Sequence, residues 1–257
     1  MSPDPDQLIP PDHLLAQYAI TAEQFANHGP GFVYEVLVKR GNLQPFDKIL
    51  DLGCGPGHHA RALTDYLSRE GSFCGLDINK AAIDYCAAAY RTYENFSFQH
   101  ANIFNGHYNP TSAVRQADYR LPWPDNHFDI AYAVSLFTHL LPEDMAAYFR
   151  EIERVLKPDG RFIATFFLLT PEAIANIADP AHPASYRFPH ALGDCRVMSL
   201  ENPSAVVAYP ETLLRHTLNE YGLRVTETTY GTWNGERDRL RTLQDIVVAI
   251  PRRLIDA

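Results

Sequence analysis

The stretch that decides the fold runs from residue 49 to residue 63 and reads ILDLGCGPGHHARAL. An apolar run with one acidic residue precedes three glycines at alternate positions and then a helix-like pattern, which indicates a strand that turns sharply into a helix beneath a ligand. Glycine has no Cβ atom, so it adopts positive φ readily and lets a ligand lie against the backbone. A dinucleotide-binding G-x-G-x-x-G fingerprint would need its third glycine at position 58, where this chain has His58. The stretch is therefore typical of a nucleoside-binding turn without a clear pyrophosphate cradle.

Length and charge narrow the classes of protein and partner. The chain has 257 residues, of which 46% are hydrophobic and 21% charged, enough for one well-buried α/β domain with an elaboration. Its net charge is −9, and its densest basic stretch, at 237–253, is interrupted by acidic residues. Proteins bind nucleic acids and anionic membranes largely through lysine and arginine side chains, so we expect neither as a partner.

Cysteine spacing and the start of the chain point to a cytoplasmic protein. The four cysteines show no C-x-x-C spacing, so we expect reduced thiols and no metal site. Residues 3–11 are rich in proline and aspartate and lack the basic and apolar regions of a signal peptide. No apolar run approaches the ~20 residues of a membrane span. We expect a cytoplasmic monomer or homodimer.

Periodicity predicts strands that alternate with helices. The expected strands are 48–52, 73–76, 96–98, 128–134, 161–168, 223–230 and 245–250, and the expected helices are 60–67, 80–90, 143–156 and 211–221. Such alternation implies a parallel sheet covered on both faces, while the last two strands have no helix between them and can pair antiparallel. We therefore predict a Rossmann-like α/β fold: a seven-stranded, mostly parallel sheet with an antiparallel last strand and helices on both faces.

Two segments fall outside this alternation. Residues 1–44 are predicted as an N-terminal helical extension with two helical pieces, interrupted at Gly29-Pro30-Gly31. Residues 45–257 form the main domain. Within it, about 170–209 are rich in proline without a sustained period, which predicts a cap insertion over one end of the sheet.

Four motifs in order carry a resemblance to a known family. They are D-x-G-x-G-x-G at 51–57, GLD at 75–77, LPWPDNHFD at 121–129 and ERVLKPDG at 153–160. Together they resemble the class I S-adenosylmethionine-dependent methyltransferases, in particular the small-molecule subgroup, over about residues 45–168. The resemblance implies a transferase of the EC 2.1.1 type, with S-adenosylmethionine as cofactor, S-adenosylhomocysteine as product and a small-molecule methyl acceptor.

The resemblance also implies which residues bind the cofactor. Asp77 matches the acid for the ribose diol, with a surface turn or helix cap as its structural alternative. Asp51 matches the acid that holds the methionine end, and its alternative is plain strand termination. At the adenine position Asn102 replaces the family's usual acid but still offers a carbonyl oxygen, and Asp118 is a competing candidate. The expected cofactor-binding residues are Asp51, Gly53, Cys54, Gly55, Gly57, Asp77, Ile78, Asn102, Ile103, Val134 and Ser135.

His139 lies just past the fourth expected strand, where a general base beside the donor is needed. Histidine titrates near neutral pH and can take a proton from a hydroxyl or a protonated amine. The alternative is that it only hydrogen-bonds the loop before the next helix. The neighbours His58 and His59 point about 100° apart on a helix and would not share a metal without a third ligand elsewhere, so we expect them in helix-surface and loop-facing roles.

Acceptor recognition is expected from the N-terminal helices, the insertion and the loop between the last two strands. Tyr186, Arg187, Tyr230 and Trp233 are the candidates, and the alternative is that they pack the insertion onto the domain. The expected reaction is O-methylation of a hydroxyl by in-line transfer, with N- or C-methylation as alternatives. Two further classes of function remain as alternatives. One is an NAD-dependent oxidoreductase, which would need the G-x-G-x-x-G fingerprint, and the other is a non-catalytic S-adenosylmethionine-binding protein.

Overall fold

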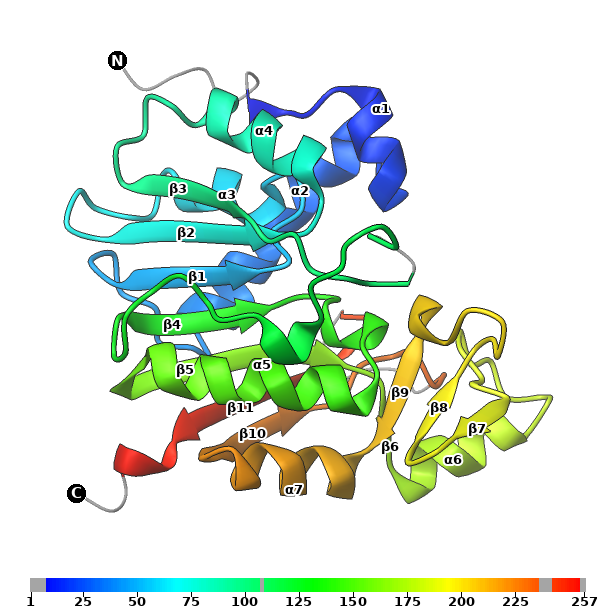
Figure 1. Cartoon of the computed structure of the whole chain (residues 1–257). Coiled ribbons are helices and arrows are strands. Elements are labelled where there is room, and N and C mark those ends of the chain that lie inside the picture. The colour runs from blue at the N-terminus through cyan, green and yellow to red at the C-terminus, as the bar shows by residue number, and fades with distance from the viewer. Residues whose placement is uncertain (1–7, 107–108, 236–241, 255–257) are drawn as a thin grey trace. The chain divides into compact units, whose positions relative to one another are not determined.

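The computed structural model describes residues 8–106, 109–235 and 242–254, and its main sheet has seven strands in the order β10-β11-β5-β4-β1-β2-β3 (Figure 1). The strands are β1 (Lys48–Leu52), β2 (Ser72–Asp77), β3 (Phe96–His100), β4 (Phe128–Ala133), β5 (Leu156–Phe166), β10 (Leu223–Thr229) and β11 (Asp245–Pro251). β1 pairs in parallel with β2 and β4, and β2 with β3, whereas β11 runs antiparallel to both neighbours. The predicted Rossmann-like sheet with an antiparallel last strand is confirmed.

The chain divides into two compact units. The first comprises Met1–Asn102 and Phe128–Tyr132, and the second comprises Ile103–His127 and Ala133–Ala257. The first unit contains α2 (Ala22–Phe32), α3 (His58–Leu63) and α4 (Lys80–Ala89), and the second contains α5 (Pro142–Val155) and α7 (Glu211–Glu220). The glycine turn and Asp77 therefore belong to the first unit, and His139 belongs to the second.

The N-terminal helices differ from prediction in where they break. The chain forms α1 (Asp12–Leu15), the 3-10 turn η2 (Ala16–Tyr18), α2 and the π-helical η3 (Val33–Val38). The break falls before α2, where Ala19 takes a left-handed conformation at φ 52°. Thr21 then begins α2 with a capping box to Gln24. The predicted interruption at Gly29-Pro30-Gly31 is wrong, because α2 continues through it.

Two tertiary contacts explain why this helix tolerates proline. Pro30 has no amide hydrogen, so the carbonyl of Ala26 four residues earlier loses its helical donor. The Nη1 atom of Arg61, on α3, donates to that carbonyl at 3.2 Å instead. Gly29 packs against α3 so closely that a Cβ atom there would stand 2.5 Å from the carbonyl oxygen of His58. The Gly-Pro-Gly stretch is therefore a helix contact surface.

The proline-rich insertion has secondary structure of its own. A second sheet of four strands has the order β6-β9-β8-β7 and begins one residue after β5 ends (Figure 1). Its elements are β6 (Leu168–Leu169), α6 (Pro171–Ala178), β7 (His190–Leu192), β8 (Cys195–Val197) and β9 (Val207–Pro210). Strands of two to four residues are too short to show a period in sequence, which is why this sheet was not predicted.

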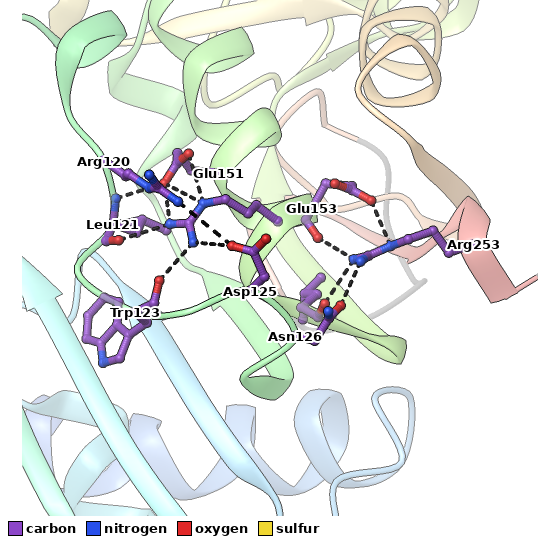
Figure 2. A network of polar contacts seen from close by, with 10 residues as sticks. Arg120, Leu121, Trp123, Asp125, Asn126, Glu151, Glu153 and Arg253 are labelled. Atoms are coloured by element: carbon purple, nitrogen blue, oxygen red, sulfur yellow. Dashed lines mark hydrogen bonds and ion pairs between the residues drawn. The ribbon is translucent and has the colours of Figure 1, made fainter.

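Arg154 holds the LPWPDNHFD stretch in place through contacts with Leu121, Trp123, Asp125 and Glu151. Figure 2 labels these four partners. From α5 its guanidinium donates to the carbonyl oxygens of Leu121 and Trp123 at 2.9 and 2.8 Å. It also pairs with the carboxylates of Glu151 at 2.6 Å and Asp125 at 2.9 Å. Glu151 in turn accepts from the amide of Leu121 at 2.9 Å. The LPWPDNHFD motif is therefore held by one planar cation that donates to several acceptors.

Arg154→Ala is expected to lower the free energy of unfolding by about 3 kcal/mol, because it leaves the buried Glu151 carboxylate without its cation and two carbonyls without a donor. Urea unfolding followed by circular dichroism measures this. The control is Arg150→Ala, since that exposed residue on the same helix makes a single 3.3 Å hydrogen bond to Ala117. Equal losses for the two variants would contradict a special role for Arg154.

Candidate active site

The glycine turn after β1 has the geometry that its sequence predicts. Gly53, Gly55 and Gly57 have φ values of 81°, 50° and 86°, all in the left-handed region. The amides of Gly53 and Cys54 both donate to the carbonyl of Leu76, at 2.8 and 3.1 Å, which ties the turn to β2. Helix α3 starts immediately afterwards, at His58. The turn is thus anchored to the strand that carries Asp77.

Asp77 ends β2 and joins directly to this turn. Its Oδ2 accepts from the amide of Gly55 at 2.7 Å, and its Oδ1 accepts from the amide of Asn79 at 2.7 Å. Burial raises the pKa of the Asp77 carboxyl, while the two amide donors lower it and the charge of Asp51 raises it further. Each carboxylate oxygen has two lone pairs, so each retains acceptor capacity for a diol.

Asp51 is buried at 1% exposure and has a partner that sequence reasoning missed. The hydroxyl of Tyr132, on the adjacent strand β4, donates to Asp51 Oδ2 at 2.8 Å. Burial raises the pKa of Tyr132, and the negative Asp51 adds to that rise. His59 Nδ1 lies 3.9 Å from the same oxygen. The only sequence signal was a tyrosine inside a largely apolar strand.

His58 and His59 take part in an aromatic stack, so their expected surface position is wrong. The His58 ring stacks on Phe25 and on His59, with centroids 5.1 and 5.3 Å apart, and His59 stacks on Phe32 at 4.6 Å. Burial lowers the pKa of His58 to about 4, helped by the neighbouring histidines. Among the described residues, no group of three histidine, cysteine, aspartate or glutamate side chains is placed to hold a metal ion.

The residues of the first unit fit the cofactor that the family resemblance implies. Asp77 offers acceptors for a ribose diol, and the backbone of the glycine turn offers a close surface. One further group fits a polar ligand: the hydroxyl of Tyr18 is buried and forms no hydrogen bond with any described residue. A buried hydroxyl without a partner is unfavourable, and a bound ligand with an acceptor atom would satisfy it. Asn102, the expected adenine contact, is exposed.

The expected residues of the second unit follow two different strands, Ile103 coming after β3 and Val134 and Ser135 directly after β4. Ile103 is buried at 2% exposure, and Val134 is half-buried. Ser135 adopts a left-handed φ of 56°, which is rare for a residue with a side chain. Its amide donates to Thr165 Oγ1 at 2.8 Å, and both hydroxyls reach Gln244 Oε1. These three polar side chains hold the strained residue in place.

His139 ends the 3-10 turn η5 (Phe137–His139) and is half-buried. Its Nδ1 lies 3.4 Å from the carbonyl oxygen of Ser204. The side-chain amide of Asn105 donates to the His139 carbonyl at 3.3 Å, and Asn105 itself bridges to Asn109 through backbone hydrogen bonds. Ser204 and Asn105 had no sequence signal for this role, because they lie 65 and 34 residues away from His139.

The four expected acceptor-binding residues make packing contacts. Trp233 is fully buried between Phe167 and Phe188, in T-shaped contacts with both. Arg187 donates to carbonyl oxygens at the end of α6, including those of Ile177 and Asp179. The other two are half-buried: Tyr186 packs on Phe167 and Phe188, and Tyr230 donates to Glu211 at 2.9 Å. For Trp233 these contacts support the packing alternative, whereas the hydrogen bonds of Arg187 stay within the insertion.

Asp245, at the start of β11, was not predicted and organises this region. Its carboxylate accepts from the Trp233 Nε1 at 2.8 Å and from the amides of Leu168 and Gly231 at 2.6 and 2.7 Å. It therefore links β6 to the segment after β10. Burial raises the pKa of Asp245 to about 6, and the three N–H donors oppose the rise.

Asp245 should make stability depend on pH. Between its ordinary pKa of 3.8 and about 6, the folded carboxyl holds a proton that the unfolded chain has released. The unfolding free energy therefore falls as pH rises through this window, by about 3 kcal/mol in all, and levels off above it. We expect the difference in urea stability between wild type and Asp245→Asn to show this fall, because other titrations cancel in the difference. An Asp194→Asn control, at an exposed carboxylate, should give a constant difference, and a constant difference for Asp245→Asn would contradict the assignment.

Comparisons with known proteins agree with this geometry. Residues 50–164 match the family model described as a methyltransferase domain. An uncharacterised methyltransferase of Schizosaccharomyces pombe is 34% identical over 114 residues, which are 44% of this chain and 37% of that protein. A sterol 24-C-methyltransferase of Aspergillus fumigatus is 29% identical over 148 residues, 58% of this chain and 34% of that protein. The matched region thus spans little more than a third of these relatives' length.

A solved structure extends the likeness to the whole fold. The SAM-dependent methyltransferase from Aquifex aeolicus superposes with a TM-score of 0.56 at 15% identity, covering 97% of this chain and 100% of that one. At this identity the likeness concerns the fold alone. No helix in the described part of the chain is long and apolar enough to cross a membrane.

Proposed function

We propose, from the premise that residues 50–164 belong to the class I S-adenosylmethionine-dependent methyltransferase family, that this chain is an enzyme that methylates a small molecule. The observation that carries the proposal is the hydrogen bond between Gly55 and Asp77. It joins the glycine turn and the acid at the end of β2 into one structure, as a nucleoside site requires. An NAD-dependent oxidoreductase is disfavoured, because the G-x-G-x-x-G spacing is absent and the sheet ends in an antiparallel strand.

Cofactor binding is assigned first to the carboxylates. Asp77 would accept hydrogen bonds from the ribose hydroxyls, and Asp51 would hold the amino group of the methionine part, with Tyr132 fixing its orientation. The bound sulfonium would supply an electrophilic methyl group. The other residues that we propose to contact the cofactor are Gly53, Cys54, Gly55 and Gly57 of the glycine turn and, outside it, Ile78, Asn102, Ile103, Val134 and Ser135.

For the acceptor we propose a hydroxyl, with His139 as general base. A proton on His139 Nδ1, donated to the Ser204 carbonyl, makes Nε2 the basic nitrogen of the ring. Nε2 would then take the hydroxyl proton as the oxygen attacks the methyl group in line. The half-buried rings of Tyr186 and Tyr230 remain candidates for contact with the acceptor. A partly apolar hydroxyl compound, such as a phenol, suits such residues.

Carbon methylation is the second candidate, because relatives of this domain include sterol 24-C-methyltransferases. A sterol side chain has no proton to lose before attack, so His139 would not be needed as a base at that step. Nitrogen methylation of a small amine is the third candidate.

An acceptor panel tests the proposal. The protein is incubated with S-adenosylmethionine and a set of phenols, aliphatic alcohols, amines and sterols, and S-adenosylhomocysteine and methylated product are measured by mass spectrometry. Turnover with hydroxyl compounds supports O-methylation. Turnover with sterols alone would instead indicate C-methylation, and turnover with amines alone would indicate N-methylation. Tight S-adenosylhomocysteine binding with no turnover on the panel would instead indicate a non-catalytic binding protein.

A further inference from the structure

The short N-terminal turn η2 lies against both turns assigned to the cofactor. The ring of Tyr18 covers Gly55, where a Cβ atom would stand 3.1 Å from Tyr18 Cε1. One residue earlier, Gln17 Oε1 accepts from Asn79 Nδ2 at 2.9 Å. Gly55 belongs to the turn after β1, and Asn79 follows Asp77 at the end of β2. Two independent contacts therefore place this segment over the glycine turn and the acid.

The hydroxyl of Tyr18 is the second observation. It is buried and has no hydrogen-bond partner among the described residues, although it lies in a polar neighbourhood. Burial raises the pKa of Tyr18 and the charge of Asp77 raises it further, while the side-chain amide of Asn79, a donor directed at the phenol oxygen, opposes the rise. The phenol of Tyr18 is therefore neutral and keeps its proton, and it lies close enough to Asp77 to interact electrostatically with that carboxylate. The hydroxyl proton itself has no acceptor among the described residues. A buried donor without an acceptor is rare in folded proteins and points to a missing ligand.

We propose that Tyr18 is a cofactor-binding residue and that residues 12–21 form a cover over bound S-adenosylmethionine. The phenol donates a hydrogen bond to an oxygen of the cofactor's ribose, the part assigned to Asp77, so the inference rests on the proposed function. Sequence reasoning assigned the N-terminal helices to the acceptor. Here the contacts of Gln17 and Tyr18 assign this part of them to the cofactor.

The local backbone suits a cover that orders on binding. Leu14 and Leu15 are its buried apolar anchors, and its two helices, α1 and η2, have only four and three residues. Such short helices have little stability of their own and depend on the surface they contact. Ala19, in the left-handed conformation, separates the helical part of the cover, residues 12–18, from α2, which begins at its own cap, Thr21. The cover can therefore loosen without unfolding α2.

Tyr18→Phe is the sharpest test, because it keeps the ring on Gly55 and removes only the hydroxyl. We expect the Kd for S-adenosylhomocysteine, measured by titration calorimetry, to rise roughly 5- to 10-fold, the loss of one hydrogen bond. The melting temperature of the ligand-free protein should stay the same or rise, because an unsatisfied buried group is removed. A purely structural tyrosine would show the reverse, a lower melting temperature with unchanged affinity.

The matched control is Tyr34→Phe, at a tyrosine of η3 that is 57% exposed. It should bind S-adenosylhomocysteine as wild type does. If Tyr18→Phe also binds within twofold of wild type, the assignment of Tyr18 is overturned while the proposed function stands. If the wild-type chain itself binds no S-adenosylhomocysteine, the proposed function fails.

Hydrogen exchange tests the cover separately from the hydroxyl. Saturating S-adenosylhomocysteine should slow amide exchange over residues 12–21 in the wild type, and less so in Tyr18→Phe at the same fractional saturation. If the amide exchange rates of residues 12–21 are the same with and without S-adenosylhomocysteine, the proposal that this segment covers the cofactor is wrong, whatever the affinity of the variant.

Discussion

Asp77→Ala is expected to weaken S-adenosylhomocysteine binding at least about a hundredfold, because hydrogen bonds to a charged acceptor contribute about 1.5–3 kcal/mol each and a ribose diol offers two. The variant also removes the acceptor for the amides of Gly55 and Asn79, so both turns lose their shared anchor. Titration calorimetry with S-adenosylhomocysteine measures the change. An affinity within about twofold of wild type would show that Asp77 does not bind the ribose.

Two companion variants separate binding from folding. Asp84→Ala removes a carboxylate on α4 that is 62% exposed and paired with Lys80, so it should leave the affinity unchanged. Asp77→Asn keeps the size and one acceptor oxygen, and we expect it to bind more tightly than the alanine variant and less tightly than wild type. Circular dichroism and melting curves of the free variants then reveal any loss of fold. A gain of affinity in Asp77→Asn would contradict the role of the negative charge.

His139→Ala should lower kcat by about a hundredfold or more on the acceptor identified by the panel, because general base catalysis contributes about 10²–10⁴ in rate. The Kd for S-adenosylhomocysteine should not change. The pH profile of kcat should differ between the variant and the wild type if His139 is the base.

The control for this variant is His216→Ala, whose imidazole on α7 is 68% exposed. It should leave kcat and its pH profile unchanged. A His139→Ala enzyme with the wild-type rate would assign His139 to its alternative role, as a hydrogen-bonding residue of the loop before α5. A reduced rate with the wild-type pH profile would indicate that His139 positions the acceptor and that another group takes the proton.

The strands and the glycine turn could be predicted because they depend on neighbours in sequence. The apolar run 48–52 and the three glycines encode a strand and its turn locally, and the structure reproduces both. The antiparallel ending followed from the absence of a helical pattern between the last two strands. The sequence predicted that an insertion lies at about 170–209 but not its secondary structure, because its strands are too short for a period and its core depends on Trp233 and Phe167 meeting across 66 residues.

The sequence by itself determined the class of fold, the glycine turn after β1 and the position of Asp77 at the end of β2, since each depends on a short run of neighbouring residues. Only the tertiary structure decided that Tyr132 orients Asp51, that α2 continues through Pro30, and that Tyr18 lies over Gly55 with its hydroxyl unsatisfied. Each of these joins residues far apart in the chain, where no local spacing or periodicity records the contact.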